Sequence, residues 1–290
     1  MHNIENEFLR ISARNYGSEL ISIFNKKTGT EHLWQADEKF WGWHAPMLFP
    51  IVGRTINDQL SIDGKNYPME KHGFARKSTF ELLELSEQKM VFVLRSNAET
   101  CKIYPYHFEL LSAFSIKENR LTHSFEVINT GNEPMYFQLG GHPAFAVPFY
   151  ANESYSDYYL EFEKTENAHR HFINTDGFFD GRTELVLNNT PTLPLQPDTF
   201  AEDAIIFKNL QSKSVSIRSK NHSHYLKVDF HDFNYLGLWA KVNAPYVCIE
   251  PWLGCASAIG DSGELIKKEE VITLPAGNSL MRHFSVSISP

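Results

Sequence analysis

The stretch HFELLSAFSIKENRLTHSFEVINTGNEPMYFQLGG (residues 107–141) decides the fold class, because it contains three strand-like runs separated by two turns. Apolar and polar residues alternate in the first two runs, and the turns fall at residues 118–119 and 130–132. Such alternation is typical of β-strands with one buried face. Sustained helical periodicity is absent from the chain, and residues 97–102 form at best one helical turn.

Similar short runs recur along the chain at intervals of about 8–14 residues, a spacing typical of all-β folds. Turn signals separate them at residues 27–29, 86–88 and 275–277, and Asp-Gly at 63–64 is a strong two-residue hairpin signal. The sequence therefore predicts an all-β sandwich or barrel.

We expect residues 1–290 to form one domain, because no linker or internal repeat interrupts them. Residues 146–204 are the least strand-like and contain four prolines. We interpret that segment as long loops that carry short strands.

Composition restricts the partners. The net charge is −8 and basic residues do not cluster, which argues against nucleic acid. No run approaches about 18 apolar residues, so we expect no membrane span. The first ten residues do not resemble a signal peptide, and the three cysteines, Cys101, Cys248 and Cys255, lack paired spacing. These features favour a reducing, cytoplasmic location.

Two fragments present candidate catalytic side chains, GGHPAF at 140–145 and CIEPW at 248–252. His142 follows two glycines and precedes a proline, a constrained turn that can aim an imidazole. Glu250 shares a strand face with Cys248, and we expect Pro251 to end that strand. A carboxylate on an apolar strand is costly unless it is paired or used. The ordinary alternatives to catalytic roles are that His142 is a structural histidine hydrogen-bonded to the backbone, and that Glu250 forms an ion pair with an arginine distant in the sequence.

Two shorter fragments, FPIVGR at 49–54 and HGFAR at 72–76, add candidate binding residues. They contain Arg54, His72 and Arg76, and Asp203 opens a later β-like run. Guanidinium, imidazole and carboxylate groups all hydrogen-bond hydroxyls. An isolated arginine is more often a structural ion pair, and Asp203 could equally cap a turn.

Two His-x-His pairs raise a metal hypothesis. They are His169–His171 and His222–His224, with His231 further on. Neither pair has a carboxylate in register, so we interpret these side chains as solvated histidines and predict no metal site. No cofactor-binding motif is present, and we predict no cofactor.

In combination, HGFAR, GGHPAF and CIEPW resemble the aldose 1-epimerase (galactose mutarotase-like) family, in order and approximate spacing over nearly the whole chain. The GLW (237–239) and EPW (250–252) segments are similar to its LacX-like branch. The resemblance implies a large, twisted antiparallel β-sandwich with its site in a cleft on one sheet.

The resemblance also implies residue roles. Glu250 would be the general base and His142 the general acid in opening and closing an aldohexose ring. By position, Arg54, His72 and Asp203 would bind the sugar, and Arg76 is a further candidate.

The expected partner is a small sugar, and the chain would be a monomer or homodimer. Three alternatives stay open: a hexose-6-phosphate mutarotase with Arg54 and Arg76 on the phosphate, a non-catalytic carbohydrate-binding or sensing protein, and a metal-dependent β-barrel enzyme.

Overall fold

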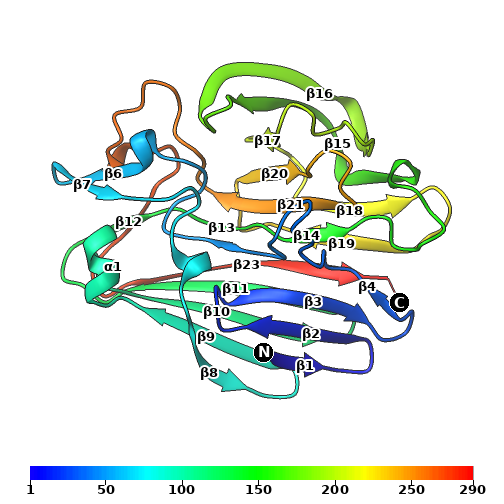
Figure 1. The fold of residues 1–290 in the computed structure, drawn as a ribbon, viewed down its shortest axis with the longest axis horizontal. Helices are drawn as coiled ribbons and strands as arrows, with labels where there is room; N and C mark the ends of the chain where they lie inside the picture. The colour runs from blue at the N-terminus through cyan, green and yellow to red at the C-terminus, as the bar shows by residue number, and fades with distance from the viewer. Residues whose placement is uncertain (290) are drawn as a thin grey trace.

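The computed structural model describes residues 1–289, most of which lie in antiparallel β-strands (Figure 1). The prediction of an all-β fold with a large antiparallel sheet is confirmed. Within this part of the chain, no helix is long and apolar enough to cross a bilayer.

The largest sheet has fifteen strands, which we give in chain order. Its first eight are β5 (Met47–Leu48), β8 (Glu81–Leu85), β9 (Lys89–Arg95), β10 (Phe108–Lys117), β11 (Arg120–Asn129), β13 (Leu139–Gly141), β14 (Ala144–Ala146) and β15 (Tyr158–Ile173). The others are β16 (Phe179–Pro194), β17 (Ile205–Phe207), β18 (Ser214–Ser219), β19 (Tyr225–Asp229), β20 (Tyr235–Trp239), β21 (Tyr246–Leu253) and β23 (Ser279–Ile288). The spatial order is β5-β13-β21-β20-β17-β15-β18-β19-β23-β11-β10-β9-β8, with β14 paired to β21 and β16 to β15.

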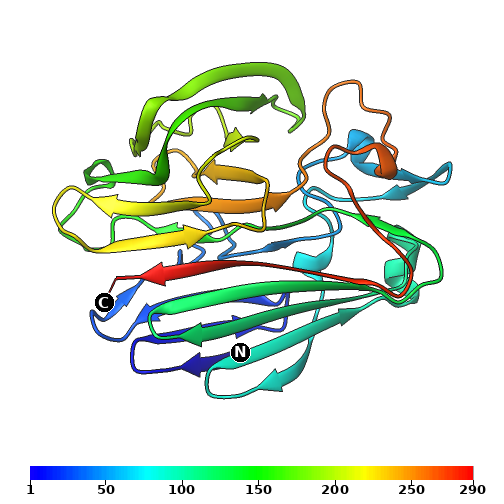
Figure 2. The same cartoon turned by 180° about the vertical axis from the view of Figure 1, so that it is seen from behind.

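A separate four-stranded sheet contains β1 (His2–Glu5), β2 (Leu9–Arg14), β3 (Glu19–Asn25) and β4 (Thr30–Glu31). It lies against the β8–β11 part of the large sheet in both views (Figures 1 and 2). Buried residues of both layers, among them Ile11, Leu20, Phe92 and Phe114, belong to one apolar cluster. Burying these faces from water is the main stabilising contribution to the fold.

The opening stretch folds as its pattern predicts. In β10 and β11 every second residue is buried, and the two strands pair in register from Phe108–Asn129 to Lys117–Arg120. The turn at 118–119 joins them, and Glu118 takes a positive φ of 53°. The predicted turns at 63–64 and 86–88 also join paired strands.

Small elements complete the structure. They are the strand pairs β6 (Gln59–Ile62) with β7 (Lys65–Pro68) and β12 (Met135–Phe137) with β22 (Ile272–Leu274), the helix α1 (Ala98–Ile103), and the 3₁₀ turns η1 (Ile56–Asp58), η2 (Ala75–Lys77), η3 (Tyr155–Asp157) and η4 (Leu265–Lys267). The Asn97 side chain caps α1 by accepting from the backbone N–H groups of Glu99 and Thr100.

The turn at 275–277 does not join a hairpin. It connects β22 to β23, but β22 pairs with β12, whereas β23 lies between β11 and β19. A turn signal in the sequence indicates only that the chain changes direction. Which strands then pair depends on contacts with strands that are distant in the sequence.

The interpretation of residues 146–204 as long loops is wrong. Two 16-residue strands, β15 and β16, form a hairpin that arches over one end of the large sheet (Figures 1 and 2). Their pairing contains four register shifts, which break the simple alternation. Because β16 is an edge strand, only three of its sixteen residues are buried, and it accommodates Pro191 and Pro194.

The expectation that Pro251 ends its strand is also wrong. Strand β21 continues to Leu253, every residue in it is buried, and Pro251 pairs with Leu236 of β20. Trp252 requires small neighbours, because a Cβ at Gly140 or Gly237 would lie 2.8 or 2.6 Å from its indole. Glu250 is therefore held on a fully buried, paired strand.

Candidate functional site

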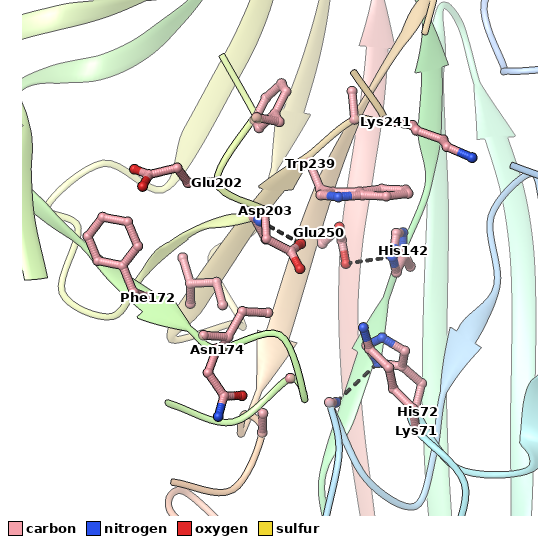
Figure 3. Close-up of a pocket in the computed structure, with 18 of the residues that line it drawn as sticks. Lys71, His72, His142, Phe172, Asn174, Glu202, Asp203, Trp239, Lys241 and Glu250 are labelled. Atoms are coloured by element: carbon pink, nitrogen blue, oxygen red, sulfur yellow. Dashed lines mark hydrogen bonds and ion pairs between the residues drawn. The ribbon is translucent and has the colours of Figure 1, made fainter. Parts of the chain in front are cut away.

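A cavity of about 720 Å³ lies over the face of β21 that carries Glu250. Its walls come from segments far apart in the sequence: the loop before η2, the loop between β13 and β14, the β15–β16 turn, the segment before β17, and the end of β20. Figure 3 shows His142 and Glu250 together, with Asp203, Trp239 and His72 around them.

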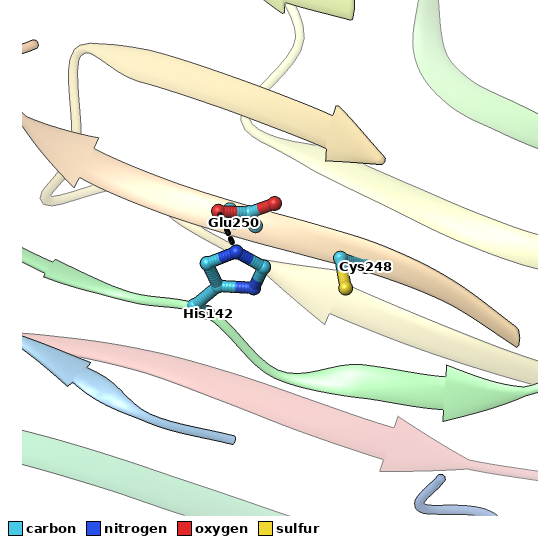
Figure 4. Close-up of side chains that lie close together, drawn as sticks. All are labelled: His142, Cys248 and Glu250. Atoms are coloured by element: carbon cyan, nitrogen blue, oxygen red, sulfur yellow. Dashed lines mark ion pairs between the residues drawn. The ribbon is translucent and has the colours of Figure 1, made fainter. Parts of the chain in front are cut away.

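The two predicted catalytic residues meet at this cavity. His142 Nε2 lies 3.2 Å from Glu250 Oε2, and the side chains are only 10% and 2% exposed (Figure 4). The backbone N–H of His142 donates to the Pro46 carbonyl, which fixes the loop. Gly141 is required beside it, because a Cβ there would lie 2.8 Å from the Phe284 ring.

Burial sets the protonation of this pair. Desolvation raises the pKa of Glu250 well above its usual value; Lys71 opposes the shift and Asp203 adds to it. Desolvation also lowers the pKa of His142 to about 3, and Lys71 contributes in the same direction. The pair therefore rests as a carboxylic acid beside a neutral imidazole, with one proton to share.

Both members of the pair retain unused hydrogen-bonding capacity. Glu250 Oε2 and His142 Nδ1 are buried, and within residues 1–289 neither finds a hydrogen-bond partner. Leaving such groups unsatisfied costs about 1–3 kcal/mol each. A hydroxylated ligand in the cavity would remove part of that cost at Glu250.

His72 is prepared as a neutral donor. Its Nδ1 accepts from the Gly53 N–H at 3.1 Å, so the ring proton lies on Nε2. Burial lowers its pKa well below the usual value, and its ring meets His142 edge-on at 5.7 Å between centroids. Its φ of 67° is sterically unfavourable for a side-chain-bearing residue, which indicates that the surrounding loop imposes it.

Asp203 and Arg76 also line the cavity. Asp203 has a φ of 66°, and its side chain accepts a hydrogen bond from the Ala204 N–H at 2.8 Å. Its negative charge contributes to the raised pKa of Glu250. Arg76 donates to the Lys71 carbonyl at 2.8 Å and lies 5.5 Å from the Trp43 ring centre. Its Nε has no hydrogen-bond partner in the described chain.

Arg54 lies elsewhere. Its Nε and Nη2 atoms donate hydrogen bonds to the two carboxylate oxygens of Asp58, at 2.6 and 2.7 Å, and its Nη1 donates to the Asp176 carbonyl. It faces a neighbouring cavity and is not part of the wall around Glu250. The structure thus brings five of the six predicted residues to the site and places Arg54 beside it.

Sequence reasoning missed the aromatic walls and the lysines. Trp41 stacks on the His142 ring at 4.8 Å, and Trp239 meets it edge-on at 6.1 Å. Lys71 and Lys241 also line the cavity. Trp41 lies in a loop with no recognisable motif, so its only sequence signal was the high aromatic content, which is more often core.

Metal-ligating groups occur here as well. Ligand atoms of His142, Cys248 and Glu250 lie within 4.8 Å of one another, and no other group of three was found among residues 1–289 (Figure 4). The His-x-His pairs lie outside this cavity. His169 is exposed as expected, but His222 and His224 are half-buried against Glu153 and Tyr150.

Comparisons with known proteins place the chain in a family. The family model for aldose 1-epimerase matches residues 1–273. The plasmid and chromosomal LacX proteins of Lactococcus lactis subsp. lactis are 34% identical to this chain over 296 residues, covering 98% of each chain.

Solved structures extend the comparison. A galactose mutarotase related enzyme from Lactobacillus acidophilus is 33% identical, with a TM-score of 0.95 over 100% of this chain and 97% of its own. A galactose mutarotase-like protein from Lactobacillus casei is 32% identical, with a TM-score of 0.93 over the full length of both chains.

Proposed function

The chain belongs to the aldose 1-epimerase family, and from that premise we propose that it interconverts the α and β anomers of an unphosphorylated aldohexose unit. The observation that carries the proposal is the buried His142–Glu250 pair, 3.2 Å apart in the wall of an accessible cavity. Acid/base groups within hydrogen-bond reach of one substrate atom pair are what ring opening needs.

The reaction balances with this pair alone. The Glu250 carboxylate takes the proton of the anomeric hydroxyl, the bond from C1 to the ring oxygen breaks, and the ring oxygen takes a proton from His142 Nε2. The product is the open-chain aldehyde. Rotation about C1–C2 and reclosure, with both proton transfers reversed, gives the other anomer. This sequence uses no redox equivalent, and we propose that no metal or cofactor takes part.

These roles require the proton to move from Glu250 to His142 before reaction. Burial favours the uncharged arrangement, and the Lys71 ammonium favours the Glu250 carboxylate but disfavours the His142 imidazolium. Sugar hydroxyls that donate to Glu250 would shift the balance further toward the carboxylate. Substrate binding thus prepares the base and the acid together.

The other residues are suited to binding hydroxyls. His72 presents Nε2–H, Arg76 an unused Nε, and Asp203 a carboxylate beside Glu250. Arg54, bound to Asp58, would act on the sugar only through that neighbouring region. We place the reaction in the cytoplasm, with one domain per chain.

The proposal is tested on a panel of aldohexoses and their 6-phosphates, by polarimetry or NMR exchange between anomeric signals. Free sugars should be turned over at least about tenfold better in kcat/KM, equivalent to about 1.4 kcal/mol. Preference for 6-phosphates would favour the phosphosugar alternative. Binding without turnover of any sugar would favour a carbohydrate-binding protein.

A further inference from the structure

A second cavity of about 830 Å³ adjoins the one over Glu250. The two share five lining residues, which form the passage between them: Lys71, Arg76, Thr175, Gly177 and Asp203. The proposed reaction needs one sugar ring beside His142 and Glu250, and it assigns nothing to this second space.

Charges in the second cavity largely cancel in pairs. Arg54 is bound to Asp58 at 2.6 Å, and Lys77 forms an ion pair with Glu70. Within residues 1–289, Lys71 and Arg76 have no carboxylate partner, but the carboxylates of Asp176 and Asp203 line the same space. A phosphate dianion would meet these acids as well as the bases. Such a lining favours an occupant without net charge.

The remaining surface is apolar, with hydroxyl partners at its edge. Pro68, Met69, Phe74 and Ile103 contribute apolar groups, and Phe74 is half-buried. Ser78 and Thr175 add hydroxyls, and Lys71 adds an ammonium with free donors. An uncharged ring with apolar faces and a hydroxyl rim fits this combination, since pockets pair apolar walls with a few polar groups.

We propose that the second cavity is a subsite for a second sugar unit. The substrate is then a reducing disaccharide or longer oligosaccharide. Its reducing-end ring lies beside His142 and Glu250, and the next unit passes Lys71 and Asp203 into the second cavity. This inference rests on the proposed function and specifies its substrate class.

The test compares reducing disaccharides of 1→3, 1→4 and 1→6 linkage with their free reducing-end monosaccharides, by NMR exchange at the anomeric centre. At least one disaccharide should exceed its monosaccharide by about tenfold in kcat/KM. Ile103 lies at the end of α1 and lines only the second cavity. Ile103→Trp should cut the disaccharide value about tenfold and leave the monosaccharide value within about twofold.

Ile103→Leu is the matched control, because it keeps the volume, and it should leave both values unchanged. Monosaccharide turnover without any disaccharide preference, or an Ile103→Trp variant that treats both alike, would overturn the subsite and leave the proposed function intact. A 6-phosphate that is preferred and blocked by Ile103→Trp would assign the cavity to phosphate instead. No turnover of any sugar would refute the proposed function itself.

Discussion

Two histidine–glutamate pairs in this protein have nearly the same distance between imidazole nitrogen and carboxylate oxygen, but they differ in the hydrogen bonds that the glutamate receives. His142 Nε2 lies 3.2 Å from Glu250 Oε2, and His222 Nε2 lies 3.3 Å from Glu153 Oε2. Glu153 also receives hydrogen bonds from Tyr158, Ser219 and Asn221, whereas Glu250 Oε2 has no hydrogen-bond partner in the described chain.

The difference appears in the pKa values. Burial opposes ionisation of Glu153, but the hydrogen bonds from Tyr158 and Asn221 and the His222 charge hold its pKa below the usual value. At Glu250 burial is the largest influence and raises the pKa, while the Lys71 charge and the Trp252 side chain act in the opposite direction. A satisfied carboxylate is a structural group, and an unsatisfied one facing a cavity is available for proton transfer. Donor count, more than distance, distinguishes the two.

The largest expected effect is on turnover. Glu250→Gln keeps the side-chain shape but cannot accept the anomeric proton, so mutarotation should fall by about 100-fold or more. The matched change Glu153→Gln, made in the other pair, should leave turnover within about twofold. Polarimetry, corrected for spontaneous mutarotation, measures both.

Sugar affinity is the control for this experiment. By NMR titration it should survive Glu250→Gln within a few-fold, which separates lost chemistry from lost binding. A Glu250→Gln enzyme with normal turnover would remove Glu250 from the mechanism.

The next effect is pH dependence. In the proposed mechanism the pair works only while it holds one proton, so kcat/KM should follow a bell-shaped pH profile with slopes of about tenfold per pH unit on each limb. The pKa of His142, lowered to about 3, places the acid limb well below the usual histidine range. The raised pKa of Glu250 places the basic limb above the usual carboxylate range.

Kinetics from about pH 4 to pH 10 measure the basic limb, and activity should change little down to about pH 4, because the pKa of His142 is lowered to about 3. His142→Asn should reduce turnover strongly and flatten the profile with folding intact. A wild-type profile without a basic limb, or with an acid limb in the usual histidine range, would contradict shared acid/base catalysis by the pair.

A smaller effect concerns stability, with opposite signs for the two glutamates. The native pKa of Glu250 is raised from 4.5, so the unfolded chain ionises first and this contribution to stability is lost as pH rises from 4.5 through the native value. The native pKa of Glu153 is lowered, so its contribution is present above 4.5 and lost as pH falls through the native value.

At pH 8, therefore, Glu250→Gln should raise the melting temperature by at least about 2 °C, corresponding to roughly 1 kcal/mol. Glu153→Gln should lower it at the same pH. Thermal unfolding followed by circular dichroism measures both variants beside the wild type. Equal shifts of the same sign would show that the two environments do not differ as described.

The sequence predicted the parts of this comparison that depend on local pattern. Alternation in β10 and β11, and the turns at 63–64 and 118–119, follow from neighbouring residues, so the all-β fold was predictable. His142 and Glu250 were predictable as candidates, because each interrupts an apolar run beside Gly or Pro.

Features that depend on distant contacts were not predictable. The β15–β16 hairpin was not recognisable because register shifts interrupt the alternation of apolar and polar residues, and because β16 lies at an exposed edge of the sheet. Trp41 stacks on His142 only because distant parts of the chain fold together. Arg54 forms an ion pair with Asp58, and their spacing in the sequence does not by itself show whether they pair. The environment of each pair is likewise a tertiary property.

The smallest expected effect on turnover is at the second pair, where His222 belongs to one of the His-x-His pairs considered as a metal site. His222 is hydrogen-bonded to Glu153 and His224 to Tyr150, and neither histidine lines the cavity over Glu250. His222→Ala should therefore change turnover by less than about twofold. His169→Ala, at an exposed position, should behave the same. Because the proposed mechanism assigns both proton transfers to Glu250 and His142, EDTA treatment should also leave activity unchanged. Stoichiometric zinc in the purified protein, with activity lost on chelation and restored by zinc, would instead assign the chemistry to a metal and give His142, Cys248 and Glu250 the role of ligands.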